Sequence, residues 1–422
     1  IGEASYDHWF TDNHYSINAD PPVTTVDGDN LYIAHKSNEY SNVNNNDGGI
    51  HVYARSTPGD YNSGWSYVQF IKCPTPDGMS NFGAGGRYGS VGVVVDGDTM
   101  AVASTAWSSA WRSVGGYMLH RQNHITSSMS LDYASQPILV GAADGDLAGE
   151  SVVMLDSGEA LGAVGSGATA ATVVGSPNGN GGTGCVDVYI WGEDSSTAIT
   201  SAVYADKVNT YAQQYTYGPP SPLLLNDTWQ RVGATITPPS DSYGLGNSEF
   251  GYSVAASGDG TRIAIGAPGR PGTYPYSGQG QYGGSVYIYD WNSGTSAWVL
   301  DTRIVSPNTS GYNKGGNGTN GRFGHSVSMS SDGNRVVVGV PHYGSVGVTT
   351  GRVHVYERGT NNWTEINGGV ESYGNGDLAS SVLQFSSNQP TAKFGHSVSM
   401  SSDGNRIAVG APGFTWYESG NL

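Results

Sequence analysis

Charged residues are scarce in this chain, and cations are scarcer than anions. Of 422 residues only 13% are charged, with 18 Lys and Arg against 35 Asp and Glu, and the net charge is -17. A surface of this sign repels phosphate groups and no basic run offsets it, so we expect neither nucleic-acid binding nor attraction to anionic membranes. The acidity suits salty surroundings, where ions screen repulsion, and favours an extracellular or surface-associated protein.

Several common signatures are also missing. No apolar run reaches the roughly 18 residues of a membrane-spanning helix. The two cysteines, Cys73 and Cys185, are too few for a disulfide framework, and their spacing does not show whether they pair. The HExxH pair, the nucleophile elbow, the phosphate loop and the CxxC pair are absent, so we predict no enzyme activity and no cofactor.

What the chain has in abundance is glycine and tyrosine, 64 and 27 residues respectively. This composition is typical of short strands joined by tight turns, and it predicts an all-β fold.

Internal repeats are the strongest signal. Residues 250–267 read FGYSVAASGDGTRIAIGA, residues 323–340 read FGHSVSMSSDGNRVVVGV, and residues 394–411 read FGHSVSMSSDGNRIAVGA. Three weaker copies lie upstream, so that repeats start near residues 22, 87, 147, 249, 322 and 393 of a single domain spanning 1–422. Residues 195–225 interrupt the third repeat and are interpreted as an insertion.

Each repeat predicts four strands. In the fifth copy an alternating strand precedes the turn residues Asp332 and Gly333, which we expect to supply positive φ angles, and a continuous apolar strand follows. A third strand begins after a later glycine, and a Trp-led fourth strand closes the unit. Four-stranded units indicate a β-propeller, with six blades favoured over seven.

The sixth copy lacks a clear third and fourth strand. Either the N-terminal stretch SYDHWFTDNHYSI or chain beyond Leu422 is expected to complete that blade.

Two short signatures carry a family resemblance. Phe250 and Gly251, followed by Gly266, Ala267 and Pro268, resemble the FG-GAP repeat of integrin α propellers. The sixth copy repeats the pattern, and the fifth repeats it with one change, Val340 in place of alanine. The resemblance implies an extracellular propeller that binds other molecules through its loops.

The family often carries a calcium loop between the first two strands, which needs several oxygen ligands. Here Asp259, Asp332 and Asp403 each stand as a single acid near an arginine, so we interpret these loops as plain turns. The better calcium candidate is the trio Asp144, Asp146 and Glu150, or else the loop from Asn44 to Asp47.

His325 and His396 recur at the position that Tyr252 occupies in the fourth copy. We interpret this position as structural, with the blades holding the two imidazoles apart. A dispersed glycosidase site would instead draw acids from several blades, such as Asp27, Asp96, Asp156, Asp187 and Asp290.

The loops between second and third strands differ most among repeats and are expected to gather on one face of the ring. Their aromatic rings could bind sugars or protein partners, or could pack their own loops. The candidate ligand-binding residues are Tyr40, Trp107, Trp111, Tyr274, Tyr276, Tyr282 and Tyr343.

Four triplets fit the N-glycosylation rule, at Asn226, Asn308, Asn317 and Asn362, each in an expected turn or loop.

Three hypotheses follow. The first is a non-catalytic recognition or adhesion module that binds a glycan or protein through the aromatic loop face. The second is a structural subunit of a cell-surface filament, cell wall or virion. The third is a glycosidase-type propeller enzyme, against which the missing signatures stand.

Overall fold

The computed structural model describes most of the repeat strands and their turns. The described residues are 23–27, 30–35, 49–57, 59–60, 62–72, 93–96, 99–104, 108–109, 112–113, 116–121, 138–140, 147, 149–155, 161, 170–193, 227–239, 248–269, 283–306, 321–343, 350–360, 362–366 and 391–413. The expected insertion at 195–225 and Cys73 lie outside this set.

The described residues form five four-stranded sheets in which neighbouring strands run antiparallel. The first holds β1 (Val23–Asp27), β2 (Asn30–His35), β3 (Gly49–Arg55) and β4 (Trp65–Lys72). The second holds β5 (Val93–Asp96), β6 (Thr99–Ser104), β9 (Gly116–Arg121) and β10 (Ile138–Val140). The third holds β11 (Ser151–Leu155), β12 (Ala170–Ser176), β13 (Cys185–Glu193) and β14 (Asp227–Arg231).

The fourth and fifth sheets follow the clearest sequence repeats. The fourth holds β15 (Ser253–Ala256), β16 (Arg262–Ala267), β17 (Ser285–Asn292) and β18 (Ala297–Val305). The fifth holds β19 (Ser326–Met329), β20 (Arg335–Val340), β21 (Arg352–Arg358) and β22 (Trp363–Glu365). A two-stranded sheet of β23 (Ser397–Met400) and β24 (Ile407–Gly410) comes last. The predicted all-β class and four-stranded units are therefore confirmed.

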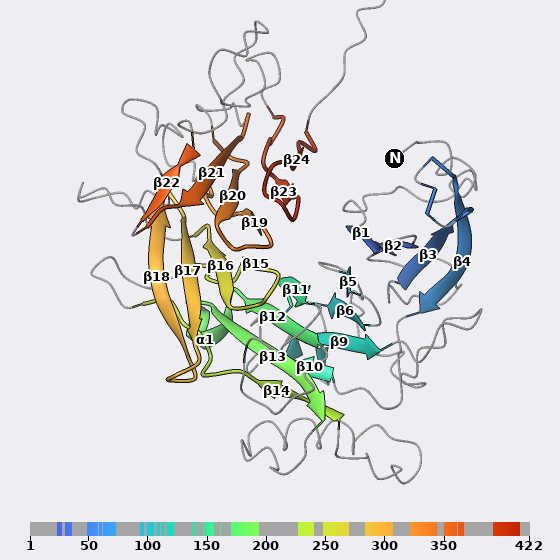
Figure 1. Ribbon diagram of the computed structural model, residues 1–422, viewed down its shortest axis with the longest axis horizontal. Coiled ribbons are helices and arrows are strands. Elements are labelled where there is room, and N and C mark those ends of the chain that lie inside the picture. The colour runs from blue at the N-terminus through green and yellow to red at the C-terminus, as the bar shows by residue number, and fades with distance from the viewer. Residues whose placement is uncertain are drawn as a thin grey trace, which may run out of the picture.

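The first strands of successive sheets lie next to one another around a common centre (Figure 1). In chain order, β1 contacts β5, β5 contacts β11, β11 contacts β15, β15 contacts β19, and β19 contacts β23. The second, third and fourth strands follow outward. The arrangement is propeller-like, and within the described residues β1 and β23 are not hydrogen-bonded to each other.

The core lies between neighbouring sheets. In β16, Ile263 and Ile265 pack toward the third sheet, whereas Ala264 between them packs toward the fifth. Because both faces of this strand are covered, its apolar residues run without interruption, as the sequence predicts for a second strand. Alternating burial in β19 follows from its position at the inner edge of its sheet.

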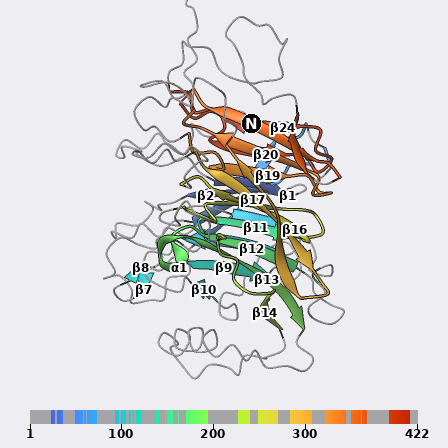
Figure 2. The same cartoon turned by 90° about the vertical axis from the view of Figure 1, so that its left-hand side faces the viewer.

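Two small elements interrupt loops between second and third strands. The ribbon of β7 (Ser108–Ser109) and β8 (Arg112–Ser113) follows β6, and α1 (Gly179–Gly182) follows β12. Both lie on the same side of the sheets, at the left of Figure 2. These loops thus share one face, which we call the loop face.

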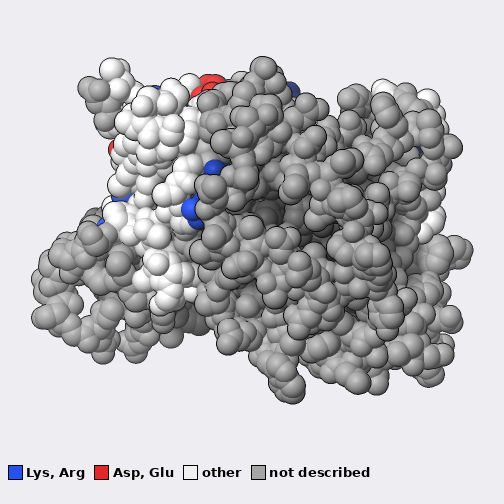
Figure 3. Space-filling view, turned by 90° about the horizontal axis from the view of Figure 1, so that it is seen from below, with Lys and Arg blue, Asp and Glu red and all other residues white. Residues whose placement is uncertain are grey.

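The described surface carries few charges, as Figure 3 shows for the side seen from below. Within the described residues, no helix has the length and apolar character that crossing a membrane requires.

Candidate functional site

The Phe-Gly and Gly-Ala-Pro signatures join each sheet to the next. The carbonyl oxygen of Gly324 lies so close to Gly266 that a Cβ there would stand 2.1 Å from it, and the Ser253 hydroxyl donates to the same oxygen at 2.8 Å. Gly339 and Ser326 meet Gly395 of the last sheet in the same way. The glycines are required because only a bare backbone fits this approach.

The phenylalanine of the signature fills the space behind this contact. Phe323 is fully buried and forms a parallel bridge to Gly284, as Phe250 does to Gly184 and Phe394 to Gly351. Burying such a ring contributes about 1.5–3 kcal/mol. The repeat thereby fixes the start of each first strand rigidly against the preceding sheet.

The residue before each phenylalanine has a left-handed backbone. Glu249, Arg322 and Lys393 have φ values of 52°, 58° and 53°, and Leu147 takes the same conformation in the third repeat with a φ of 54°. A side chain in this region costs about 1–2 kcal/mol, which glycine would avoid. The chain nevertheless keeps three charged side chains at this position.

The residues that directly follow the three Phe-Gly pairs, Tyr252, His325 and His396, form a row across three sheets. The rings of Tyr252 and His325 lie 5.0 Å apart, and those of His325 and His396 lie 4.9 Å apart. The expectation that the blades hold His325 and His396 apart is wrong. The tight contact between first strands brings equivalent positions together instead.

His325 lies at the centre of this row, and both of its ring nitrogens form hydrogen bonds within the protein. Its Nδ1 lies 3.2 Å from the carbonyl oxygen of His396, so Nδ1 carries the proton and donates it. Its Nε2, 3.3 Å from the Tyr252 hydroxyl, then accepts a hydrogen bond from it. Burial, followed by the neighbouring His396 and Arg322, lowers the pKa of His325 to about 3, so this imidazole is neutral at physiological pH.

Further charged and titratable groups border the row. His342, in the turn after β20, has its ring 6.4 Å from that of His325. Arg322 donates to Glu249 at 2.7 Å and lies 4.9 Å over the Tyr252 ring. Burial first, and then Arg322 and Lys393, lower the pKa of His342, and burial and Lys393 lower that of His396.

The row lies on the loop face. The start of each first strand pairs with the end of the second, as the bond from the Gly251 amide to the Gly266 carbonyl shows. Loops between second and third strands leave from that same end. Tyr252, His325 and His396 therefore lie where the predicted aromatic loops begin.

Tyr343 is the one predicted ligand-binding residue that the structure describes. It is half-buried against the core between the fourth and fifth sheets, with the Arg352 guanidinium 4.6 Å over its ring. Its carbonyl accepts from the Gly351 amide at 3.0 Å. Tyr343 thus packs its own loop. The other six, Tyr40, Trp107, Trp111, Tyr274, Tyr276 and Tyr282, lie outside the described residues.

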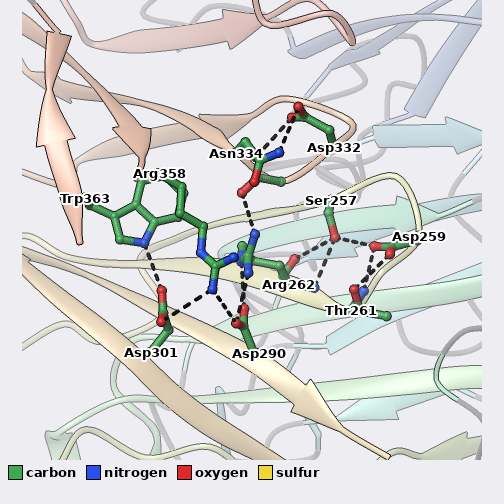
Figure 4. Close-up of polar contacts among 11 residues, drawn as sticks. Ser257, Asp259, Thr261, Arg262, Asp290, Asp301, Asp332, Asn334, Arg358 and Trp363 are labelled. Carbon is green, nitrogen blue, oxygen red and sulfur yellow. Dashed lines mark hydrogen bonds and ion pairs between the residues drawn. The ribbon is translucent and has the colours of Figure 1, made fainter. Parts of the chain in front are cut away.

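The Asp-Gly turns lie at the opposite end of the strands. The Asp259 carboxylate accepts from the Ser257 hydroxyl at 2.6 Å and from the Thr261 amide and hydroxyl at 3.0 and 2.9 Å (Figure 4). Partial burial raises the pKa of Asp259, but these hydrogen bonds outweigh it and lower the pKa overall. The carboxylate oxygens of Asp259 therefore stabilise the turn by accepting hydrogen bonds within it.

The equivalent turns show where the sequence prediction of backbone angles was wrong. Only the glycine is left-handed, with φ of 72° at Gly260 and 67° at Gly333 and Gly404. The preceding Asp332 is not, because its carboxylate holds the turn by accepting from the Asn334 amide at 3.0 Å. A longer turn with one left-handed residue replaces the tight two-residue turn.

The arginine after the turn links adjacent sheets at two of these turns, through Arg262 (Figure 4) and Arg335. Arg262 makes a two-point contact with Asp290, at 2.6 and 2.9 Å, and also donates to the Gly333 carbonyl at 3.0 Å. Arg358 approaches Asp290 at 3.5 Å. These contacts lie away from the loop face and serve the assembly of the sheets.

The acids considered for a glycosidase site take similar roles where they are described. Arg231 lies 3.7 Å from Asp187, whose pKa is raised by burial, and Asp290 is engaged by Arg262. Asp156 and the side chains of Asp27 and Asp96 lie outside the described set.

Of the calcium candidates, Asp144, Asp146 and the loop from Asn44 to Asp47 lie outside the described residues. Glu150 directly precedes β11, is half-buried, and adds its charge to the burial that raises the pKa of Tyr252. Among described residues, no three His, Cys, Asp or Glu side chains are grouped to bind a metal.

Of the glycosylation candidates, Asn362 is exposed in the turn before β22. Asn226, Asn308 and Asn317 themselves lie outside the described residues.

Sequence reasoning missed His342, Arg322, Glu249 and Lys393. A signal existed for the last three, since each immediately precedes the phenylalanine of its repeat. No pattern marks His342.

Comparison with known proteins gives one family match. Residues 234–289 match the FG-GAP repeat, a range that contains Phe250, Gly251 and the Gly-Ala-Pro signature. No curated protein sequence matches the chain.

Two solved structures are similar in shape at low identity. One is Sqt1 of Saccharomyces cerevisiae, with 11% identity, a TM-score of 0.41, and coverage of 82% of this chain and 62% of that one. The other is the periplasmic gluconolactonase PpgL of Pseudomonas aeruginosa, with 11% identity, a TM-score of 0.41, and coverage of 82% and 69%. The chain thus aligns with less than two thirds of Sqt1. Its family match is to the FG-GAP repeat, over residues 234–289, which is the family that the Phe-Gly and Gly-Ala-Pro signatures resemble.

Proposed function

We propose that the chain is an extracellular, non-catalytic recognition module, a six-bladed propeller that binds a glycan or protein partner through its loop face. The observation that carries this proposal is the row of Tyr252, His325 and His396, which crosses three sheets on the face where the variable aromatic loops begin. Rigid contacts between repeats hold this row while the loops are free to differ, which suits recognition.

The chemistry of the row favours binding over catalysis. A nucleophile or general acid needs a group that changes its protonation near neutral pH. His325 is neutral and both of its nitrogens are used, and the described acids Asp187 and Asp290 are engaged by arginines. The proposal includes no nucleic-acid partner and no membrane insertion.

The test replaces Tyr274, Tyr276 and Tyr282 together by Ala and measures binding to glycan and surface-protein arrays, in calcium and in chelator. We expect binding to weaken at least tenfold with nearly unchanged thermal unfolding, because the sequence predicts that these tyrosines belong to a loop between the second and third strands of their repeat. Tyr67→Ala is the matched control, since Tyr67 is 53% exposed on the outer strand β4. Equal binding by the triple variant and the wild type contradicts the proposal.

A second candidate is a structural subunit that packs laterally in a surface assembly. It is favoured by Val299 and Leu300, which are 47% and 38% exposed on the outermost strand β18. Sedimentation of native extracts tests it, and a strictly monomeric profile would count against it.

A further inference from the structure

The last sheet of the series differs from the five before it. Those five have four strands each, whereas the described part of the chain places only β23 beside β24 (Figure 1). Ile407 and Val409 of β24 are partly exposed, while Val336 and Val338, at the equivalent positions of β20, are fully buried. The outward side of β24 is thus a strand edge that another strand can cover, and we call it the open edge.

The backbone of β24 can bond to a strand added at the open edge. The Ser401 amide donates to the Arg406 carbonyl, so Arg406 and every second residue after it direct their backbone groups toward β23. Backbone groups of successive residues in a strand point to opposite sides. Ile407 and Val409 therefore direct their amide and carbonyl groups to the open edge.

An arginine at this edge indicates which charge the added strand carries. In the fourth and fifth sheets the arginine after the turn meets an acid directly opposite on the third strand, Arg262 with Asp290 at 2.6 Å and Arg335 with Glu357 at 2.8 Å. Arg406 has the same position, because its amide also donates to the serine hydroxyl of the preceding turn at 3.0 Å. A strand that fits the open edge places a carboxylate opposite Arg406.

The third strands of the fourth and fifth sheets share a pattern that ends in this acid. They read VYIYD from Val286 and VHVYE from Val353, with a tyrosine before the acid and apolar residues one and three positions before the tyrosine. Residues 414–418 read FTWYE and match the pattern at every position. Residues 3–7, EASYD, share the final pair but have polar residues at both apolar positions. The chain's own best match is therefore 414–418.

The connection between β24 and this segment is short. With Glu418 opposite Arg406 of the same chain, only residues 411–413 would connect the two paired strands. The equivalent connections in the third and fifth sheets are residues 176–185 and 340–352.

The position of Gly413 shortens the reach of the segment further. The Gly413 amide donates to the Ala392 carbonyl at 3.1 Å, in the stretch that leads into β23. A chain held at Gly413 has no residues left with which to turn back along the open edge. A connection this short favours exchange of the strand with a second molecule of the same chain.

We propose that two molecules of this chain exchange residues 414–418, each pairing this segment with the open edge of the other. Glu418 of one molecule then lies opposite Arg406 of the other, and Thr415 opposite Val409. Each molecule donates one strand and accepts one, so the exchange closes as a dimer. The inference goes beyond recognition on the loop face and does not depend on it, because the exchanged strand lies along a sheet edge.

Charge reversal tests the exchange, with sedimentation velocity of the full chain over a range of concentrations as the measurement. We expect the wild type to dimerise. Arg406→Glu and Glu418→Arg should each weaken the dimer roughly tenfold, because like charges then lie opposite each other. An equimolar mixture of the two variants should dimerise within a few fold of the wild type, since each molecule supplies the opposite charge at both contacts.

A backbone variant tests the strand pairing separately. Thr415→Pro should weaken the dimer at least tenfold, because proline has no amide to donate to the Val409 carbonyl. Thr415→Val keeps the amide and is the matched control, which should dimerise as the wild type does. Thermal unfolding of both variants checks that the fold is retained.

The mixture separates exchange from pairing within one molecule. A wild type that is monomeric at every concentration, or a mixture no heavier than its two components, overturns the proposal. Rescue by the double variant Arg406→Glu/Glu418→Arg without rescue by mixing would assign the segment to its own β24 and would overturn it as well. Dimers that ignore all three single changes would show that another surface joins the molecules, which also contradicts the exchange.

Discussion

At the scale of single residues, the repeat signature has a direct physical meaning. Gly266 and Gly339 are the points where one sheet touches the backbone of the next, and Phe323 seals the contact. The sequence could predict that these residues matter, because they recur. It could not predict their partners, because the contacts join repeats and depend on the angle between sheets.

Gly266→Ala is expected to destabilise the fold by about 3 kcal/mol, since its methyl group would lie 2.1 Å from the Gly324 oxygen and 2.2 Å from the Ser253 hydroxyl. Gly64→Ala is the control, because the nearest atom to a Cβ there is 3.9 Å away. Urea unfolding of both variants measures the difference. Equal midpoints would refute the role given to Gly266.

His325 should make stability depend on pH. Its pKa is about 3 in the fold, chiefly through burial, against about 6.5 in the unfolded chain. The neutral imidazole therefore contributes stability fully above pH 6.5. This contribution is lost as the pH falls from 6.5 toward 3, because the unfolded chain takes up a proton first, at up to about 1.4 kcal/mol per pH unit.

His325→Tyr, which copies Tyr252, should flatten the curve of unfolding free energy against pH between 6.5 and 3. The matched variant His396→Tyr changes a half-exposed ring and should flatten it less. Curves for wild type and His325→Tyr that run parallel would show that the imidazole is not the titrating group.

At the scale of elements, the strands follow the sequence pattern closely. The third strands β17 and β21 begin directly after a glycine, and the Trp-led fourth strands β4, β18 and β22 lie where the pattern places them. Period and turn chemistry are local, so a sequence can show them. The backbone angles of the Asp-Gly turns could not be predicted from the sequence, because they depend on which side chain donates a hydrogen bond to the Asp carboxylate.

Arg262→Lys should lower the free energy of unfolding by about 1–3 kcal/mol, since lysine cannot keep two contacts to Asp290 and a third to Gly333. Arg335→Lys is the matched change in the next repeat, where the Glu357 partner is 49% exposed, and should cost about 1 kcal/mol or less. Chemical denaturation compares the two. An equal loss would contradict the role of burial at Arg262.

At the scale of the whole molecule, successive repeats of the sequence form neighbouring sheets. The first strands of these sheets lie around a common centre (Figure 1). That much follows from contiguous repeats. The row of Tyr252, His325 and His396 does not, because only the packing of first strands brings these positions within 5.0 Å ring to ring. The sequence therefore predicts part of the candidate site. It shows that the position after each Phe-Gly pair recurs, but it does not show that the rings at this position contact one another.

The central claim is that partners bind on the loop face. It is tested most directly by hydrogen exchange of the chain with and without its tightest array ligand. We expect slower exchange at residues 321–325, 340–343 and 391–396, with turns 257–261, 330–334 and 401–405 unchanged. Protection confined to those turns, at the opposite end of the strands, would contradict the account.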